Sequence, residues 1–270
     1  MQQVTILYAV VTAVVQGLTE YLPISSSGHL ALVNHFFGVG GNFGLTFTIF
    51  LHGATLLALL AYFWREIIDL IRCWAPSHRH DMAGQRRIFV FIVLASLVTG
   101  PMGIVLNKYM PNWDSNLIMV GIGFVVTTIF LVVSEFLSSR ITQKHLDRIG
   151  PGRALFIGFM QGLAIPPGIS RSGTTIAAGL ISGLDREQAA RFSFLVGIPA
   201  IVASFALDVV KTHGITLNAP SIIGFVLAGV IGYVSIAFLL ALVRRVKLYG
   251  FAIYTGLIAI ATLIIGVMKF

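Results

Sequence analysis

The chain has 270 residues, of which 57% are hydrophobic and only 10% are charged. Soluble domains carry about 25% charged residues, so this composition excludes an ordinary soluble protein and predicts a chain solvated largely by lipid. A net charge of +8 does not indicate nucleic-acid binding here, because the basic residues follow a membrane pattern described below. The only cysteine, Cys73, excludes an internal disulfide and a cysteine metal cluster.

Six apolar runs are each long enough to cross a hydrocarbon core of about 30 Å. They are nearly free of charge, as membrane spans are expected to be. In chain order these predicted spans are 45–63, 88–106, 116–134, 192–210, 221–243 and 248–268.

Two further regions, 4–37 and 154–184, contain apolar stretches interrupted by a polar turn with proline. In the second region the stretches 154–165 and 175–184 are too short to cross a bilayer. We therefore predict that each region forms a re-entrant helical hairpin, which enters and leaves the membrane on one side. The first half of 4–37 is long enough to span by itself, so length alone leaves that region ambiguous.

An internal repeat relates the two regions. Seven of the thirteen positions from 16 to 28 are identical to the positions 145 residues later, and Phe47 and Phe192 keep the same offset. Each half then consists of one hairpin and three spans, and because three is odd the second half must be inverted. We predict a single all-α polytopic membrane domain, with repeat one at about 1–137 and repeat two at about 150–270. Inverted repeats with broken helices are a known way to build a polar site within the membrane.

The distribution of basic residues supports this topology. If residues 64–87, 138–153, 182–191 and 244–247 face the cytoplasm, they hold 14 of the 18 lysines and arginines. The opposite side keeps only Lys108, Lys211 and Lys269, which satisfies the positive-inside rule with both termini outside. We interpret the 14 basic residues as solvated charges of the inner face, whereas the remaining one, Arg171, lies within a hairpin.

The two hairpin turns carry the candidate site. Each turn has a proline break, then hydroxyl residues and a glycine, and then a new helix. Serine or threonine at a helix start caps the free N–H groups, and the helix N-terminus favours anions. The Arg171 guanidinium adds a fork that suits phosphate oxygens. The side chains that we predict to bind a phosphorylated ligand are Gln16, Ser25, Ser27, Ser170, Ser172, Thr174 and Thr175.

Charged side chains at membrane depth cost roughly 2.5–3.5 kcal/mol on insertion scales, which singles out Glu20 and Arg171. A purely structural ion pair is the alternative interpretation of these two residues, and close packing is the alternative for the serines. His29 lies beside three hydroxyl residues and is a further candidate. His52 lies within a predicted span, where we expect it to form helix–helix hydrogen bonds.

Together these motifs resemble the undecaprenyl-diphosphate phosphatase family, which is known for bacitracin resistance. The resemblance covers nearly the whole chain and rests on the order of spans and on two motifs. The first motif is Gln16-x-x-x-Glu20 with Pro23-x-Ser25-Ser26-Ser27-Gly28-His29, and the second is Pro167-Gly168-x-Ser170-Arg171-Ser172-x-x-Thr175. The first position of the family's acidic motif is Glu or Gln, and Gln16 here leaves one carboxylate. The chain departs from the family at Ser27, where threonine is common, and at Ile165-Pro166, where a bulkier aromatic residue is common.

The resemblance implies hydrolysis of undecaprenyl diphosphate to undecaprenyl phosphate and inorganic phosphate, which recycles the lipid carrier for cell-wall synthesis. It implies that Ser26 is the nucleophile, that His29 accepts its proton and that Arg171 neutralises phosphoryl charge. Glu20 would hold a divalent cation, Mg²⁺ or Ca²⁺, shared with substrate phosphates because Gln16 leaves one carboxylate. Direct attack by water or by His29 fits these residues as well.

A transporter or flippase of a lipid-linked or anionic substrate is the alternative function, because inverted repeats and broken helices are typical of transporters. A structural membrane subunit would leave Glu20 and Arg171 unexplained. The family resemblance implies a multi-pass protein of the bacterial inner membrane, with a site facing the periplasm. The expected partners are the polyprenyl diphosphate and the bilayer, without nucleic acid, and the prediction is compatible with a homodimer.

Overall fold

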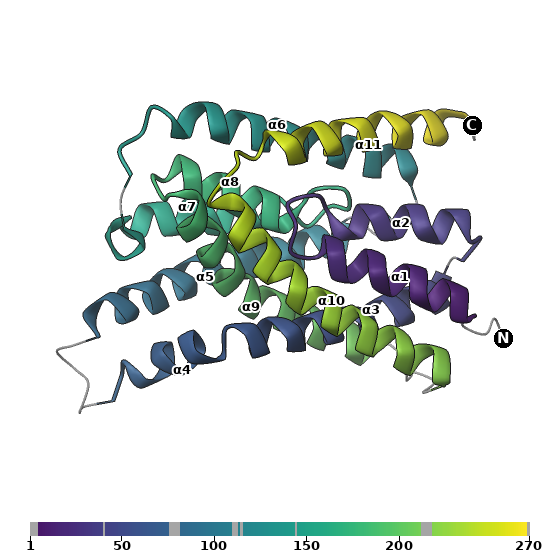
Figure 1. The fold of residues 1–270 in the computed structure, drawn as a ribbon, viewed down its shortest axis with the longest axis horizontal. Helices are drawn as coiled ribbons and strands as arrows, with labels where there is room; N and C mark the ends of the chain where they lie inside the picture. Colours follow the sequence, from purple (N-terminus) through teal and green to yellow (C-terminus); the bar gives the residue numbers. More distant parts are fainter. Residues whose placement is uncertain are drawn as a thin grey trace.

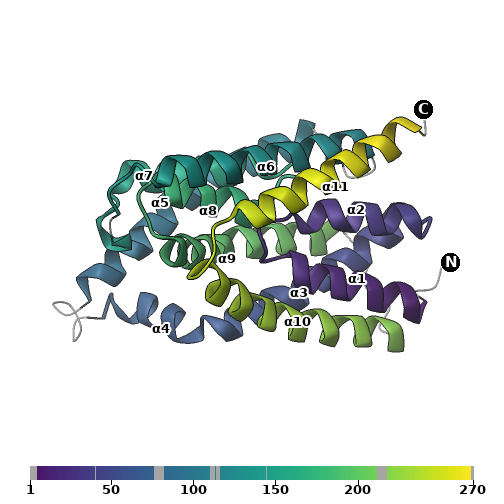
Figure 2. The ribbon, with the colours of Figure 1, turned by 45° about the horizontal axis from the view of Figure 1, so that its top comes forward.

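A computed structural model describes residues 5–39, 41–75, 82–109, 113, 116–143, 145–211 and 218–268. Within these ranges the chain forms eleven α-helices and a short 3-10 helix, η3 (Leu146–Arg148), and contains no strand. The elements lie roughly along one long axis (Figures 1 and 2). The prediction of an all-α chain is therefore confirmed.

Five helices are long and apolar enough to cross a membrane, and a bent pair supplies a sixth candidate. The pair consists of α3 (Gly41–Tyr62) and α4 (Trp64–Arg72), which meet at an angle of 66°. These candidates coincide with the six predicted runs in order. The single helices are α5 (Ala83–Tyr109), α6 (Leu117–Ser138), α9 (Arg186–Lys211), α10 (Ala219–Val243) and α11 (Tyr249–Met268).

Several helices extend beyond the apolar runs that predicted them. Helix α5 begins at Ala83, whereas its apolar run begins at residue 88, and α9 begins at Arg186, whereas its run begins at residue 192. The added turns contain glutamine, glutamate and arginine, which are good helix formers. An apolar run thus marks the part of a helix that meets lipid, and the helix continues into the polar zone.

Four short helices form two antiparallel pairs. Helix α1 (Ile6–Thr19) packs against α2 (Ser26–Phe36), and α7 (Pro151–Gly162) packs against α8 (Arg171–Ile181). At 1.5 Å per residue a helix of 14 residues is about 21 Å long, which is too short to cross the hydrocarbon core. Figure 1 shows α1 and α2 running from the end that holds both termini to the middle of the molecule, while α7 and α8 lie toward the opposite end.

Glycines allow the short helices to approach the long ones closely. A Cβ atom on Gly17 of α1 would lie 2.8 Å from Ile231 Cβ in α10. A Cβ atom on Gly158 of α7 would overlap the backbone of Ala95 in α5. Small residues at such crossings are the usual basis of helix association in membranes, where lipid removes the hydrophobic driving force. The glycines thus fix the depth at which each short pair sits.

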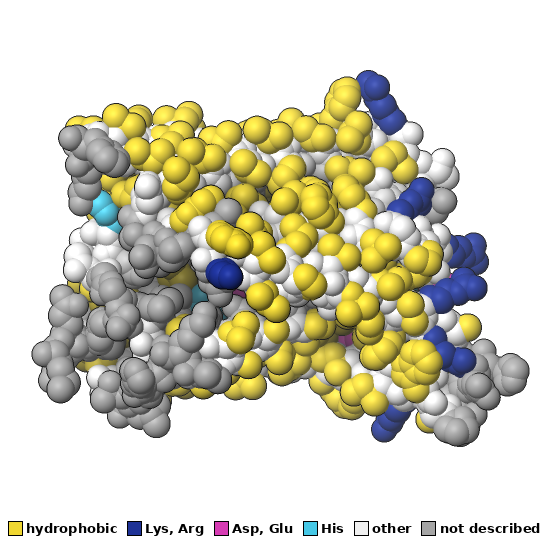
Figure 3. Space-filling model, turned by 180° about the vertical axis from the view of Figure 1, so that it is seen from behind, with side chains coloured by type: hydrophobic (Ala, Val, Ile, Leu, Met, Phe, Trp, Pro, Cys, Tyr) yellow, Lys and Arg dark blue, Asp and Glu magenta, His cyan; other side chains and the backbone are white. Residues whose placement is uncertain are grey.

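Lysine and arginine side chains gather at one end of the molecule, whereas hydrophobic side chains cover its length (Figure 3). This basic end lies opposite to the end that holds both termini. Five long apolar helices and this surface make the chain a multi-pass membrane protein, as predicted. Arg79, Lys144 and Lys269 lie outside the described residues, and only the backbone of Lys211 is described.

The contact between Gly158 and Ala95 provides a test of this packing. We expect Gly158→Ala to lower the apparent Tm in detergent, because the added methyl group must push two helix backbones apart, and overpacking costs about 1–3 kcal/mol. Gly152→Ala is the matched control, since a Cβ atom at Gly152 in the same helix meets nothing within 4 Å. Equal melting temperatures for the two variants would show that α7 does not pack on α5 in this way.

Candidate functional site

The two inter-helix turns, at residues 20–25 and 163–170, enclose a cavity of about 250 Å³ near the middle of the molecule. Its wall is completed by α3, α5 and α9. The cavity is lined by Glu20, Ser25, Ser26, Ser27, Ile49, His52, Thr99, Gln161, Ala164, Ile165, Ile169, Ser170, Arg171, Ala200, Ile201, Ser204 and Phe205. Six of the predicted site residues therefore meet around one space, three of them consecutive.

An ion pair joins the two turns. Arg171 Nη2 donates a hydrogen bond to Glu20 Oε1 at 2.7 Å. The Arg171 side chain is 17% exposed and that of Glu20 is 7% exposed, so neither charge is well solvated. Removing one partner would leave the other charge buried without compensation. The pair therefore ties the first half of the chain to the second across 151 residues of sequence.

The second carboxylate oxygen of Glu20 collects the neighbouring polar groups. Ser26 Oγ donates to Glu20 Oε2 at 2.6 Å, and Gln16 Nε2 donates to the same oxygen at 3.1 Å. Tyr21, which is fully buried, holds the turn in place because its hydroxyl donates to the carbonyl oxygen of Thr55 in α3. The Ser26 hydroxyl consequently lies directly beside a carboxylate that can accept its proton.

The first turns of α2 and α8 are capped in the same way. Ser25 Oγ accepts from the Gly28 N–H at 3.3 Å, and Ser170 Oγ accepts from the Gly173 N–H at 3.0 Å. Each capping hydroxyl also lies within hydrogen-bond distance of the hydroxyl two residues later. Ser25 Oγ is 3.3 Å from Ser27 Oγ, and Ser170 Oγ is 3.2 Å from Ser172 Oγ. These paired helix starts present N–H dipoles to the cavity from two directions, which favours an anion between them.

The two caps differ in backbone conformation. Ser25 has φ +69°, and it is the only non-glycine residue with positive φ in the described part of the chain. Its counterpart Ser170 has an ordinary φ of −74°. A strained residue of this kind costs about 1–3 kcal/mol and is retained where the surroundings over-determine it, commonly at functional sites.

One half of the Arg171 fork remains free. Its Nη1 atom is buried and has no hydrogen-bond partner, while Nη2 binds Glu20. Gly197 of α9 provides the space for this arrangement, because a Cβ atom there would overlap Nη1. A buried donor without a partner is costly, so the geometry suits a ligand oxygen at this position.

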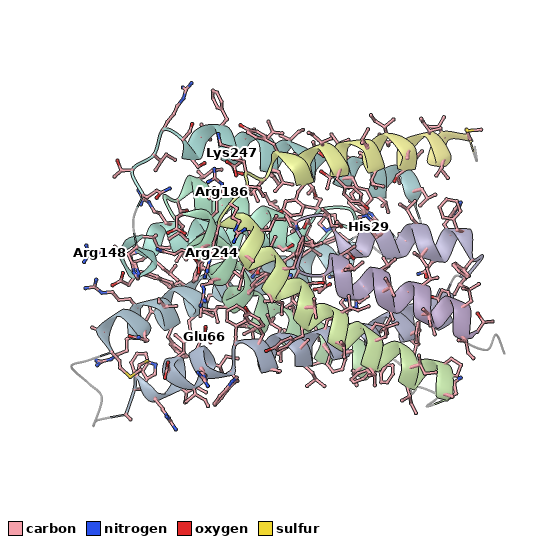
Figure 4. The ribbon with its side chains drawn as sticks, viewed as in Figure 1. His29, Glu66, Arg148, Arg186, Arg244 and Lys247 are labelled. Carbon is pink, nitrogen blue, oxygen red and sulfur yellow. The ribbon has the colours of Figure 1, made fainter. Side chains whose placement is uncertain are left out.

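His29 has partners other than Ser26. Its Nδ1 lies 2.7 Å from the Ser25 carbonyl oxygen, which can only accept, so Nδ1 carries the proton. Its Nε2 lies 2.8 Å from the Tyr254 hydroxyl, and the two rings are parallel with centroids 5.7 Å apart. The ring also meets the edge of Phe124. His29 thus braces α2 against α6 and α11, and Figure 4 shows it near the middle of the molecule, apart from the labelled charges of the basic end.

His52 lines the cavity, whereas the sequence predicts that it forms helix–helix hydrogen bonds. Its Nδ1 donates to the Thr48 carbonyl oxygen at 2.9 Å, and its Nε2 lies 3.6 Å from Glu20 Oε2. The available signal was an ionisable residue within a span, which is a functional-site candidate by default. Nothing in its sequence neighbourhood distinguishes it further.

The remaining predicted residues in α8 bind protein groups. Ser172 Oγ donates to the Leu22 carbonyl oxygen at 2.9 Å, and Thr174 Oγ1 donates to the Ser170 carbonyl oxygen at 2.7 Å. Thr175 Oγ1 lies 2.5 Å from Ser193 Oγ in α9. All three side chains are buried and support the turns rather than line the cavity.

The donor set for a divalent cation is small. No group of three histidine, cysteine, aspartate or glutamate side chains that could hold a metal exists among the described residues. Glu20 supplies one carboxylate, and the neighbouring Gln16 Oε1 is buried without a hydrogen-bond partner. Carboxylate and amide oxygens suit Mg²⁺ and Ca²⁺. These two residues fit a cation whose other ligands come from phosphate oxygens and water.

Comparison with known proteins gives a consistent result. Residues 9–261 match the family model described as "Bacitracin resistance protein BacA". An undecaprenyl-diphosphatase of Methanosphaera stadtmanae is 38% identical over 97% of this chain and 99% of its own length. Proteins with the same name from Desulfosudis oleivorans and Treponema denticola are 39% and 38% identical, over 95% and 93% of this chain and 97% and 93% of their own lengths. The chain belongs to the bacitracin resistance protein BacA family.

Proposed function

We propose that this protein hydrolyses undecaprenyl diphosphate to undecaprenyl phosphate and inorganic phosphate, and so recycles the lipid carrier of cell-wall synthesis. Relatives named undecaprenyl-diphosphatase match almost the whole chain, and this favours hydrolysis over the transport alternative. The observation that carries the proposal is that a serine hydroxyl and a guanidinium bind the two oxygens of one buried carboxylate, beside an anion-sized cavity.

The membrane arrangement that we propose is the inverted repeat, with re-entrant hairpins at 4–37 and 154–184. Its support is an exchange of packing partners. Helix α1 packs on α10 and α7 packs on α5, where α1 and α7 are the first helices of the two halves and α5 and α10 are the second-last ones. Helices α6 and α11, the last of each half, pack on each other. Gly17 and Gly162, which are 145 residues apart, face equivalent helices through Ile231 and Met102.

The site opens toward the periplasm in this arrangement. With the basic end in the cytoplasm, α3 begins at the outer end and α9 ends there. The lining residue Ile49 belongs to the first half of α3 and His52 lies at the middle of that helix, while Ser204 and Phe205 belong to the second half of α9. The cavity therefore lies in the outer half of the protein.

The diphosphate enters this cavity while its isoprenoid tail stays in the bilayer. The terminal phosphoryl group lies against Arg171 Nη1 and the first N–H groups of α2 and α8. These donors stabilise the negative charge of the phosphoryl oxygens in place of solvating water. Ile49, Ile201 and Phe205 form the apolar part of the lining and contact the first isoprenyl units. The polar part of the substrate is thus held by the two turns and the apolar part by α3 and α9.

Ser26 then attacks the terminal phosphorus, and its proton passes to Glu20 Oε2, 2.6 Å away. The new Oγ–P bond replaces the bridging P–O bond, which releases undecaprenyl phosphate, and water afterwards hydrolyses the phosphoserine. We assign the proton acceptor to Glu20 rather than His29, because both His29 ring nitrogens face other groups. A divalent cation held by Glu20 and Gln16 would supply charge neutralisation on the diphosphate.

Phosphate-release kinetics in detergent test the assignments. We expect Arg171→Ala to lower kcat by about 10²–10³-fold, which is the usual effect of removing a group that stabilises transition-state charge. Glu20→Ala and Ser26→Ala should cause losses at least as large. Thr174→Ala is the control and should keep near-normal activity, because its hydroxyl binds the backbone outside the cavity. Near-normal rates for the three site variants would contradict the catalytic assignment.

A covalent intermediate distinguishes Ser26 from the other nucleophiles. We expect rapid quenching of a reaction with terminally labelled substrate to leave phosphate on Ser26, detected by peptide mass spectrometry. Acid and alkaline quenches are run in parallel, because phosphohistidine survives only the alkaline one. Label on His29, or no label in either quench, would remove Ser26 as the nucleophile.

A further inference from the structure

A second cavity, of about 420 Å³, lies at the basic end, far along the molecule from the site described above. It is bounded by the start of α5, by η3 and by the start of α7, which pack together. Its described lining consists of Arg86, Arg87, Val90, Phe91, Asp147, Arg148, Gly150 and Pro151. Three arginines and one aspartate thus meet an apolar wall at the end of the bundle.

No carboxylate forms an ion pair with the arginines of this pocket in the described part of the chain. Arg86 Nε and Nη2 are buried and have no hydrogen-bond partner. The single carboxylate, Asp147, accepts a hydrogen bond from His145 at 2.8 Å, and no ion pair joins it to a pocket arginine among the described residues. Buried donors without partners carry a desolvation cost, which a bound anion would remove.

Other arginines of the basic end have carboxylate partners. Arg186 binds Glu135 at 2.7 Å, and Arg244 binds Glu187 at 2.5 Å. Figure 4 shows Arg148 toward the outer edge of the molecule, apart from Arg186 and Arg244. Arg186 and Arg244 are paired with carboxylates, whereas no ion pair is formed by the three pocket arginines within the described part of the chain.

The helix ends increase this positive potential. Helices α5 and α7 both begin at the pocket, and neither has an acidic residue in its first turn. Gly150, the N-cap of α7, offers no side chain to satisfy the free N–H groups. Two helix N-termini and three guanidinium groups converge where acidic residues are normally favoured.

We propose that this pocket binds the phosphate group of an anionic phospholipid in the cytoplasmic leaflet. Its position fits this ligand, because the pocket lies at the basic end, where Val90 and Phe91 line the apolar wall that an acyl chain would follow. Basic pockets between membrane helices on the cytoplasmic side are suited to anionic headgroups. Free inorganic phosphate has the same recognition chemistry, so the experiment separates the two sources.

Native mass spectrometry of the full chain in neutral detergent, titrated with phosphatidylglycerol, tests the proposal. We expect one tightly retained lipid on the wild type, and about fivefold weaker retention for Arg86→Gln and for Arg148→Gln, as expected for the loss of one interfacial basic residue. Arg245→Gln is the matched control, because Arg245 is exposed at the same end outside the pocket. Hydrolysis of the diphosphate should be retained by all three variants, which shows that they are folded.

Three results would overturn the proposal: equal retention by the pocket and control variants, equal retention of phosphatidylcholine, or displacement of the lipid by millimolar inorganic phosphate. The last would assign the pocket to free phosphate. Arg148 is exposed, so Arg148→Gln keeps the test valid if Arg86→Gln does not fold.

Discussion

The contact on which the site depends is the ion pair between Glu20 and Arg171. Each residue belongs to a different half of the chain, and both side chains are largely buried, so neither charge is well solvated. The two charges are compatible with this burial only when they meet. The pair therefore requires the two turns to come together, and it orients the Ser26 hydroxyl through the same carboxylate.

The interruptions between α1 and α2 and between α7 and α8 explain how polar groups can exist in the interior of the molecule. A continuous helix satisfies its own backbone groups and presents nothing to a ligand, whereas the starts of α2 and α8 expose N–H groups in the middle of the molecule. Irregular backbone is tolerated in a membrane protein only where protein or a cavity surrounds it. Here the long helices α6 and α9 cover α8, and α1 and α6 cover α2. The strain at Ser25 is held in place by this surrounding protein.

Much of the fold followed from the sequence because each apolar run is a direct measure of lipid contact. The proximity of Glu20, Ser26 and Arg171 was predictable through the repeat, which indicated that two similar turns form one site. The orientations of the two histidines were not predictable. His29 follows Ser26 by three residues, but its ring turns to Tyr254, a residue 225 positions away, and His52 turns inward from a helix with no motif. Such orientations depend on packing between distant helices, which local spacing does not encode.

A disulfide across the two turns is the most direct measurement of the central claim. A Cβ atom on Gly173 would lie 3.4 Å from Pro23 Cβ, close to the separation of about 3.5–4.5 Å in disulfides. In a Cys73→Ser background, Pro23→Cys with Gly173→Cys should cross-link on mild oxidation. Cleavage at a protease site inserted between α4 and α5 would then leave the two fragments joined until reduction. The pair Pro23→Cys with Gly250→Cys should remain unlinked. Fragments that separate without reduction, although both cysteines at 23 and 173 react with a thiol reagent, would contradict a single site built from both halves.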